Sequence, residues 1–225
     1  MGIEAGTSFK IMESVRKGKG LKPEWEELMV NAGVPDWYIW SCKKIKYMFP
    51  KAHAAAYVMM AWRIAYCKVF YPLEYYASYF SIRADDFSYR IMCFGKDKLD
   101  EYIEDYKRRN DSLTNKEQGQ LKDMRIVQEM YARGFDFMPI DLYKSHSRNF
   151  QIVDGRLLPP FKSIDGLGET AADSIYEAAK CGKFLSVEDF IDKAKVPKTS
   201  AAVMVELGIL KGMSANNQLS LFDYM

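Results

Sequence analysis

Apolar residues recur at helical spacing along most of the chain, and the fold is therefore expected to be mainly α-helical. The longest pattern, 51–70, is rich in alanine and contains no glycine or proline before Pro72. Shorter amphipathic patterns precede and follow it, bounded by glycine, proline and capping residues such as Asp36. We expect helices over 6–17, 23–32, 34–49, 51–70, 73–83, 96–109, 115–133, 169–180, 186–194 and 199–207.

One segment departs from helical spacing. Asp154-Gly155 stands between the apolar runs FQIV and RLLP, a pattern typical of a two-residue type I′ turn. This predicts one β-hairpin close to the boundary between a large helical domain and a small one. Beyond about residue 213 no periodicity remains, and we expect a flexible C-terminal peptide.

Charge is nearly balanced overall, with 32 basic and 30 acidic residues, but its distribution is uneven. No acidic residue lies between Asp36 and Glu74, a stretch that holds Lys43, Lys44, Lys46, Lys51, Arg63 and Lys68. Basic residues interleaved with aromatic ones suit an anionic ligand, either a triphosphate or a nucleic-acid backbone. A solvated helix face has the same composition. His53, near the start of the alanine-rich helix, is more often a cap or a packed side chain than a catalytic group.

The sequence lacks the residue patterns of several kinds of catalytic and metal site. The four cysteines are scattered, there is no CxxC pair and there are two histidines, so no zinc cluster is expected. No nucleophile triad, phosphate-binding loop or carboxylate set for two magnesium ions is recognisable, and we predict no catalytic residue and no metal site. The N-terminus lacks a signal peptide, and Arg63 and Lys68 interrupt the most apolar stretch. We therefore expect a cytoplasmic chain without a membrane span.

The sharpest internal motif is IDGLGETAADSI, residues 164–175. Two glycines around one apolar residue, followed at once by a helix, indicate the second half of a helix-hairpin-helix, in which backbone N–H groups and a helix N-terminus hold a DNA phosphate. The alternative is a plain glycine turn, and Pro159 and Pro160 leave little room for the first helix. Residues 196–208 resemble a degenerate second copy. The predicted DNA-binding residues are Gly166, Leu167, Gly168, Glu169, Thr170 and Lys198.

The last ten residues, NNQLSLFDYM, carry apolar side chains in a segment without periodicity. Gln218, Leu219, Leu221 and Phe222 have the profile of a docking peptide, whose apolar groups fill a partner's pocket while the glutamine supplies a directional hydrogen bond. A short strand that folds back on its own domain is the alternative.

Several collinear motifs together resemble the C-terminal part of the PolC-type DNA polymerase III alpha subunit, a bacterial replicative polymerase of the C family. The resemblance covers essentially the whole chain. The matching runs are FKIMESVRKGKGL, the segment from VPDWYIW through FPKAHAAAY to SIRADDF, ARGFDFMPIDLY, LLPPFKSIDGLGETAADSI, GKFLSVEDF and NQLSLF.

The resemblance implies three parts: the C-terminal part of the polymerase fingers (1–134), a duplex-DNA-binding domain with tandem helix-hairpin-helix (135–212) and a tail that binds the sliding clamp, the beta subunit (213–225). It implies contacts to the incoming dNTP or template by Lys43, Lys44, Lys46, Lys51, His53 and Arg63, a grip on double-stranded primer-template DNA, and a clamp-loader subunit as a further partner. The palm carboxylates that hold Mg²⁺ lie upstream in the family, so this chain alone is expected to be an inactive part of a nucleotidyltransferase associated with the nucleoid during replication.

Two other functions remain open at this point. A stand-alone helix-hairpin-helix accessory protein tethered to the clamp would carry the same hairpin and the same tail. A helical scaffold whose tail recruits another partner would carry neither a phosphate site nor any affinity for duplex DNA.

Overall fold

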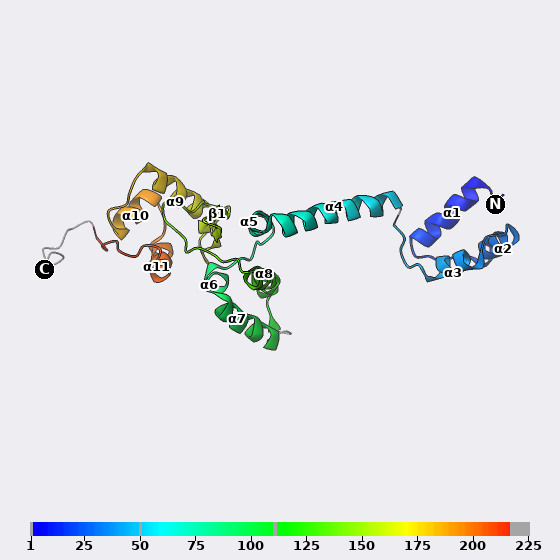
Figure 1. Ribbon diagram of the computed structural model, residues 1–225, viewed down its shortest axis with the longest axis horizontal. Helices are drawn as coiled ribbons and strands as arrows, with labels where there is room; N and C mark the ends of the chain where they lie inside the picture. Colours follow the sequence, from blue (N-terminus) through cyan, green and yellow to red (C-terminus); the bar gives the residue numbers. More distant parts are fainter. Residues whose placement is uncertain (1, 50, 110–111, 217–225) are drawn as a thin grey trace. The chain divides into compact units, whose positions relative to one another are not determined.

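The computed structural model describes residues 2–49, 51–109 and 112–216, and the chain divides into two compact units, 1–65 and 66–225 (Figure 1). The expectation of a mainly helical fold with one β-hairpin is confirmed. The helices are α1 (Ala5–Arg16), α2 (Pro23–Asn31), α3 (Asp36–Lys44), α4 (Lys51–Phe70), α5 (Pro72–Ile82), α6 (Tyr89–Met92), α7 (Lys96–Arg108), α8 (Asn115–Ala132), α9 (Glu169–Cys181), α10 (Val187–Ala194) and α11 (Lys198–Glu206), with a 3₁₀ turn, η2 (Phe161–Ser163), and the strands β1 (Gln151–Val153) and β2 (Arg156–Leu158).

The first unit packs α1, α2 and α3 around a small core of Ile11, Met29 and Ile39. Helix α2 begins at Pro23, as expected, because proline fits the first helical position. Helix α3 ends at Lys44, earlier than its sequence pattern predicts, and the prediction of Asp36 as its N-cap is wrong. Pro35 occupies that position in extended backbone and Asp36 is the first helical residue.

Glycine is required where the turn after α1 meets the segment after α3. Gly18 has a φ of +73°, and a Cβ there would lie 2.0 Å from the backbone oxygen of Lys46. The backbone N–H of Met48 donates to the carbonyl of Arg16 at 3.1 Å in the same region. These contacts hold the lysine-rich end of α3 against α1.

Helix α4 spans the residues that the sequence predicts, and the division between the two units falls inside it. None of its side chains is buried. They include large apolar groups such as Tyr57 and Trp62, which are 66% and 75% exposed.

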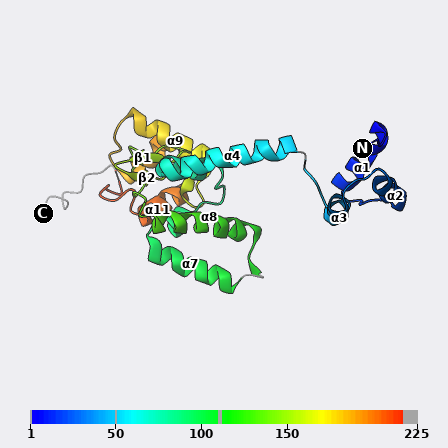
Figure 2. The same ribbon diagram turned by 45° about the vertical axis from the view of Figure 1, so that its right-hand side comes forward.

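In the second unit, α5, α7 and α8 share a core with the β-hairpin. Helices α7 and α8 lie side by side (Figure 2) and run antiparallel, since Tyr106 donates to Gln120 while Gln128 donates to Asp100. The N-terminus of α8 is closed by a capping box between Thr114 and Glu117.

The hairpin forms where it is predicted. Asp154 and Gly155 have φ of 49° and 72°, the conformation of a type I′ turn, and β1 pairs antiparallel with β2. The segment before the hairpin adds to β2, because the N–H of Met138 donates to the carbonyl of Leu157 at 2.7 Å. This pairing ties α8 to the chain that leads into η2.

Helices α9, α10 and α11 surround a second core, whose fully buried members include Phe161, Ile175, Phe190 and Met204. The short helix α6, with Ser88 as its N-cap, is not foreseen from the sequence. The three functional parts with boundaries at 134 and 212 stay a prediction, because the two compact units reflect packing rather than function.

Candidate nucleic-acid interface

The predicted glycine motif forms a tight hairpin between η2 and α9. Gly166 has a φ of +81°, which favours glycine. Leu167 follows it and points into the core, with 7% of its side chain exposed. Gly168 then has extended backbone, with φ −69° and ψ 158°, and is the N-cap of α9. The first helix of this motif is only the 3₁₀ turn η2, since Pro159 and Pro160 directly precede it.

A second hairpin with the same backbone lies between α10 and α11. Lys195 is left-handed, with φ 52°, and takes the place of Gly166. Val196, 5% exposed, takes the place of Leu167. Pro197, with φ −60° and ψ 146°, is the N-cap of α11 as Gly168 is of α9. These three residues therefore repeat the order of left-handed residue, buried apolar residue and N-cap seen in the first hairpin, while the tandem helix-hairpin-helix itself stays a prediction.

The helix N-termini that follow the two hairpins are open. Neither Gly168 nor Pro197 caps its helix with a side chain, and a Cβ placed on Gly168 would meet no atom within 4 Å. Helix α10 is different, because Ser186 accepts from the N–H of Asp189, and the N–H of Val187 donates to the carbonyl of Ser214. The free N–H groups of α9 and α11 are thus available to an anion.

The first hairpin carries its own counter-charges. Glu169, at the first position of α9, pairs with Lys162 at 2.8 Å and with Arg148 at 2.9 Å. Arg148 also pairs with Asp173, one turn further along α9. The hydrogen bond from Lys162, together with the charges of both cations, lowers the pKa of Glu169. A carboxylate therefore already stands at this helix N-terminus.

The second hairpin is positive. Lys195 and Lys198 are exposed on either side of Pro197, and neither forms an ion pair among the described residues. An uncapped helix N-terminus with two unpaired lysines favours an anion more strongly than the first hairpin does.

The structure brings most of the predicted DNA-binding residues together. Gly166 to Thr170 are contiguous in the first hairpin, and Lys198 begins the helix of the second; Leu167 and Val196 join the same core. Sequence reasoning missed Lys195. It also missed Arg148, whose contact with α9 leaves no local sequence signal. An alignment of the two hairpins places Lys195 opposite Gly166, and this alignment could have identified Lys195 from the sequence.

The predicted nucleotide-facing residues are spread along the first unit. Lys43 pairs with Glu26 of α2, and the ammonium group of Lys44 lies 5.6 Å from the ring centre of Trp40. Lys46 follows α3, and Lys51 is the first residue of α4. Of these four lysines, Lys44 thus lies beside an aromatic ring and Lys43 beside a carboxylate.

The remaining two residues of this set lie on α4. His53 is exposed and stacks on Phe49, with ring centres 5.0 Å apart, and its ring centre lies 4.4 Å from that of Tyr57. Arg63 lies two to three turns further on and contacts the sulfur of Met60 at 3.9 Å. The ten-residue step from one to the other corresponds to about 15 Å along the helix axis. His53 and Arg63 therefore cannot hold the same small group.

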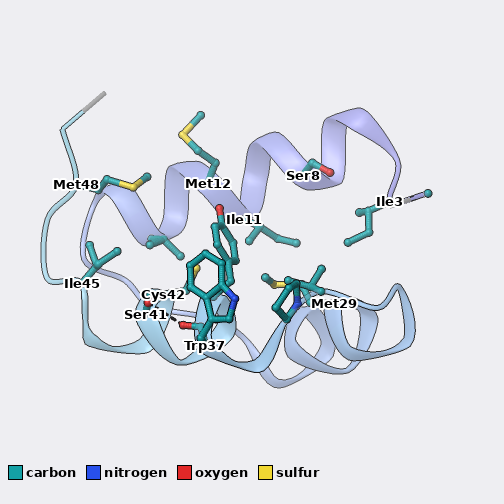
Figure 3. A pocket seen from close by; sticks show the side chains of 15 residues that line it. Ile3, Ser8, Ile11, Met12, Met29, Trp37, Ser41, Cys42, Ile45 and Met48 are labelled. Carbon is teal, nitrogen blue, oxygen red and sulfur yellow. Dashed lines mark hydrogen bonds between the residues drawn. The ribbon is translucent and has the colours of Figure 1, made fainter. Parts of the chain in front are cut away.

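A cavity of about 470 Å³ lies between α1 and α3 in the first unit (Figure 3). Its walls are largely apolar and include Ile11, Met29, Trp37 and Cys42. None of the predicted nucleotide-facing residues lines it.

Two further observations concern only the described residues. They hold no group of three histidine, cysteine, aspartate or glutamate side chains placed to bind a metal ion. None of the helices formed by these residues is both long and apolar enough to cross a membrane. The predicted clamp-binding residues Gln218, Leu219, Leu221 and Phe222 lie outside the described part of the chain.

Comparison with known proteins agrees with this site. Residues 134–219, which include both hairpins, match the family model described as a helix-hairpin-helix motif. The chain is 48% identical to a protein named DNA polymerase III PolC-type from Caldanaerobacter subterraneus subsp. tengcongensis, 51% to the one from Bacillus subtilis and 52% to the one from Listeria monocytogenes. Each match covers 98% of this chain but only 15–16% of the relative. Over nearly its whole length, the chain is therefore similar to proteins named DNA polymerase III PolC-type, and it spans about one sixth of the length of these relatives.

Proposed function

We propose that this chain is the part of a PolC-type replicative polymerase that grips the duplex behind the site of synthesis. The repeated hairpin supports the proposal most directly. Two loops with the same succession of left-handed residue, buried apolar residue and uncapped helix start offer two sets of backbone N–H groups. Such groups contact phosphates of the DNA backbone and are indifferent to sequence.

The two hairpins contribute unequally in this proposal. The charge at the second comes from Lys195 and Lys198, which remain free to pair with phosphate. At the first, Glu169 repels phosphate while it occupies Lys162 and Arg148. The second hairpin is therefore the main electrostatic contact, and the first adds mainly amide hydrogen bonds.

In the same enzyme, we assign the basic residues of the first unit to the incoming dNTP or the template. Lys44, Lys46 and Lys51 are the stronger candidates, because Lys43 is already paired with Glu26. His53, stacked on Phe49 and tilted against Tyr57, suits a base or sugar face better than a phosphate. Arg63 belongs to a separate contact further along α4.

The tail is proposed to bind the sliding clamp through Gln218, Leu219, Leu221 and Phe222. A clamp-loader subunit is proposed as a further partner. A tether of this kind makes re-binding of DNA effectively intramolecular and prolongs a weak grip. Phosphoryl transfer requires carboxylates that hold Mg²⁺. We place these in the parts of the relatives that the match does not cover, so residues 1–225 alone are expected to be inactive.

Duplex binding tests the central proposal. Fluorescence anisotropy with a labelled duplex at 50 mM salt would compare the chain with its Lys195→Ala/Lys198→Ala variant. The matched control is Lys180→Ala/Lys183→Ala, which removes the same charge at the other end of α9. Two lost phosphate contacts should weaken binding by about tenfold or more and reduce the salt slope by about 1.8. Equal losses in both variants would show that only net charge matters.

The polymerase assignment has its own test. A longer chain that includes the upstream part of the relatives should carry out templated synthesis, and the present chain should not. A folded longer chain that incorporates no nucleotide would contradict the assignment. For the tail, calorimetry with the clamp should show binding that Leu221→Ala/Phe222→Ala abolishes, while duplex affinity is retained.

A further inference from the structure

A groove lies in the second unit beside the point where the described chain ends. Its volume is about 310 Å³, and its apolar walls include Ile140, Tyr143, Ile209 and Met213. Lys144 and Lys211 also line it and are exposed. We call this feature the exit groove. Its volume is enough for a few apolar side chains but is at the lower limit for a small-molecule site.

The chain is fixed as it leaves this region. The N–H groups of Val187 and Glu188 donate to the carbonyls of Ser214 and Ala215 at 2.9 and 3.2 Å. Residues 214 and 215 are therefore held against the start of α10, directly after Met213 in the groove wall. The segment 217–225 begins two residues later, and when extended it reaches up to about 30 Å, at about 3.3 Å per residue.

The chemistry of segment 217–225 matches the exit groove. It contains Leu219, Leu221 and Phe222, one acidic side chain, Asp223, and no basic residue. The groove offers apolar walls with lysines at its edge. Its acidic residue, Asp141, accepts the N–H groups of Tyr143 and Lys144 and lies 3.9 Å from the ammonium group of Lys144, so Lys211 is the lysine of the groove that forms no ion pair among the described residues. An acidic, apolar peptide is the complementary occupant.

We propose that residues 217–225 dock in the exit groove of their own chain while no clamp is bound. The inference rests on the proposed clamp-binding role of this segment and adds a regulatory step to it. Leu221 and Phe222 cannot fill the groove and a clamp pocket together, so the two sites compete. Only the undocked fraction binds clamp, and apparent affinity falls in proportion to that fraction. A tail that is 90% docked, an illustrative value, would bind clamp about tenfold more weakly than a free peptide.

Methyl NMR of the full chain without clamp tests the docking itself. Isoleucine and methionine methyl signals of the groove, from Ile209 and Met213, would be compared between the chain and its Leu221→Ala/Phe222→Ala variant. We expect them to shift, while Ile11 and Met29 of the first unit stay unchanged as internal controls. Identical groove signals would overturn the proposal whatever the clamp does. Shifts that depend on protein concentration would mean docking in a second copy and would overturn the intramolecular form.

Clamp titration then tests the competition. Lys144→Glu/Lys211→Glu reverses the charge at the groove edge without altering its apolar walls, and Lys98→Glu/Lys107→Glu on α7 is the matched control. The groove variant should bind clamp three- to tenfold more tightly, approaching the affinity of a synthetic 213–225 peptide, and the control should not. If both variants bind equally well, competition is refuted. If the peptide and the chain both fail to bind clamp, the clamp assignment fails, whereas methyl shifts would still support docking.

Discussion

Lys195 occupies the same backbone position in the second hairpin as Gly166 does in the first. Both have positive φ, 52° and 81°, and both precede a buried apolar residue and a helix start. A residue with a Cβ is disfavoured in this conformation by about 1–2 kcal/mol, whereas glycine adopts it freely. The second hairpin therefore keeps a cationic side chain at a position where glycine would be more stable.

Replacing Lys195 by glycine should consequently change the stability of the chain and its duplex affinity in opposite directions. Lys195→Gly is expected to raise the free energy of unfolding by about 0.5–1 kcal/mol, since the strain is relieved. It should also weaken duplex binding and reduce the salt slope by about 0.9, the value for one lost phosphate contact. Urea denaturation and anisotropy measure the two effects. A more stable variant with unchanged duplex affinity would remove Lys195 from the interface.

The two glycines of the first hairpin should respond differently to the same change. Gly166→Ala is expected to cost about 1 kcal/mol of stability, because φ +81° is unfavourable for alanine although space is open there. Gly168 has an ordinary φ and equally open surroundings, so Gly168→Ala should fold normally. Its new methyl group would lie at the N-terminus of α9, where we propose that a phosphate binds.

Duplex anisotropy and thermal unfolding of both alanine variants check this pair. We expect Gly168→Ala to bind the duplex more weakly while its melting temperature stays unchanged. Gly166→Ala should instead show mainly a lower melting temperature. Full duplex affinity in Gly168→Ala would mean that the first hairpin does not approach DNA closely, and the second hairpin would then account for the grip alone.

The sequence predicts the elements of this fold well because their signals are local. The alanine-rich run without breakers gives α4, Pro23 marks the start of α2, and Asp154-Gly155 gives the hairpin turn. Asp36 was misplaced by one position, because Pro35 already has the extended backbone that an N-cap requires. Helix α6 is too short to show any periodicity.

The candidate site was predictable only in part. The glycine pattern identifies the first hairpin, but the second has lysine, valine and proline at the equivalent positions, so composition conceals it. The pairing of Glu169 with Arg148 joins residues far apart in the sequence and depends on tertiary packing. No sequence pattern could show that the hairpin with the glycines is the less positive of the two.

The pairing of Glu169 with Arg148 and Lys162 predicts a substitution that strengthens duplex binding. Glu169→Gln removes the negative charge at the N-terminus of α9 and frees Lys162 for phosphate, while Arg148 keeps its pair with Asp173. Duplex affinity should rise by about three- to tenfold at 50 mM salt and much less at 300 mM, where screening shortens the range of the charge. Glu177→Gln is the control, since it removes an exposed charge near the other end of the same helix. An equal rise in duplex affinity in the control would show that the effect comes from net charge alone and not from the position of Glu169.

Asp123 of α8 provides a test of stability against pH. Its side chain is 3% exposed, and burial, with the charges of Asp85 and Asp86 adding to it, raises its pKa from an ordinary 3.8 to about 6. Below about pH 3 the carboxyl group is largely neutral in both the folded and the unfolded chain, and its burial then has little effect on the free energy of unfolding. Between pH 4 and 6 the unfolded chain ionises first, so the folded state loses stability as pH rises, and the loss is complete above about pH 6. Asp123→Asn should therefore match the stability of the parent chain near pH 3 and exceed it by about 1–2 kcal/mol at pH 7.5. Each unit of pKa shift corresponds to about 1.4 kcal/mol, and burial of the amide offsets part of the gain. Urea denaturation followed by far-UV circular dichroism measures the free energy of unfolding at each pH. Tryptophan fluorescence reports the first unit separately, because all four tryptophans lie within residues 1–65.

The control is Glu101→Gln, on the exposed face of α7, which should change the free energy of unfolding little at either pH. A stability difference for Asp123→Asn that does not grow with pH would contradict a buried carboxylate with a raised pKa.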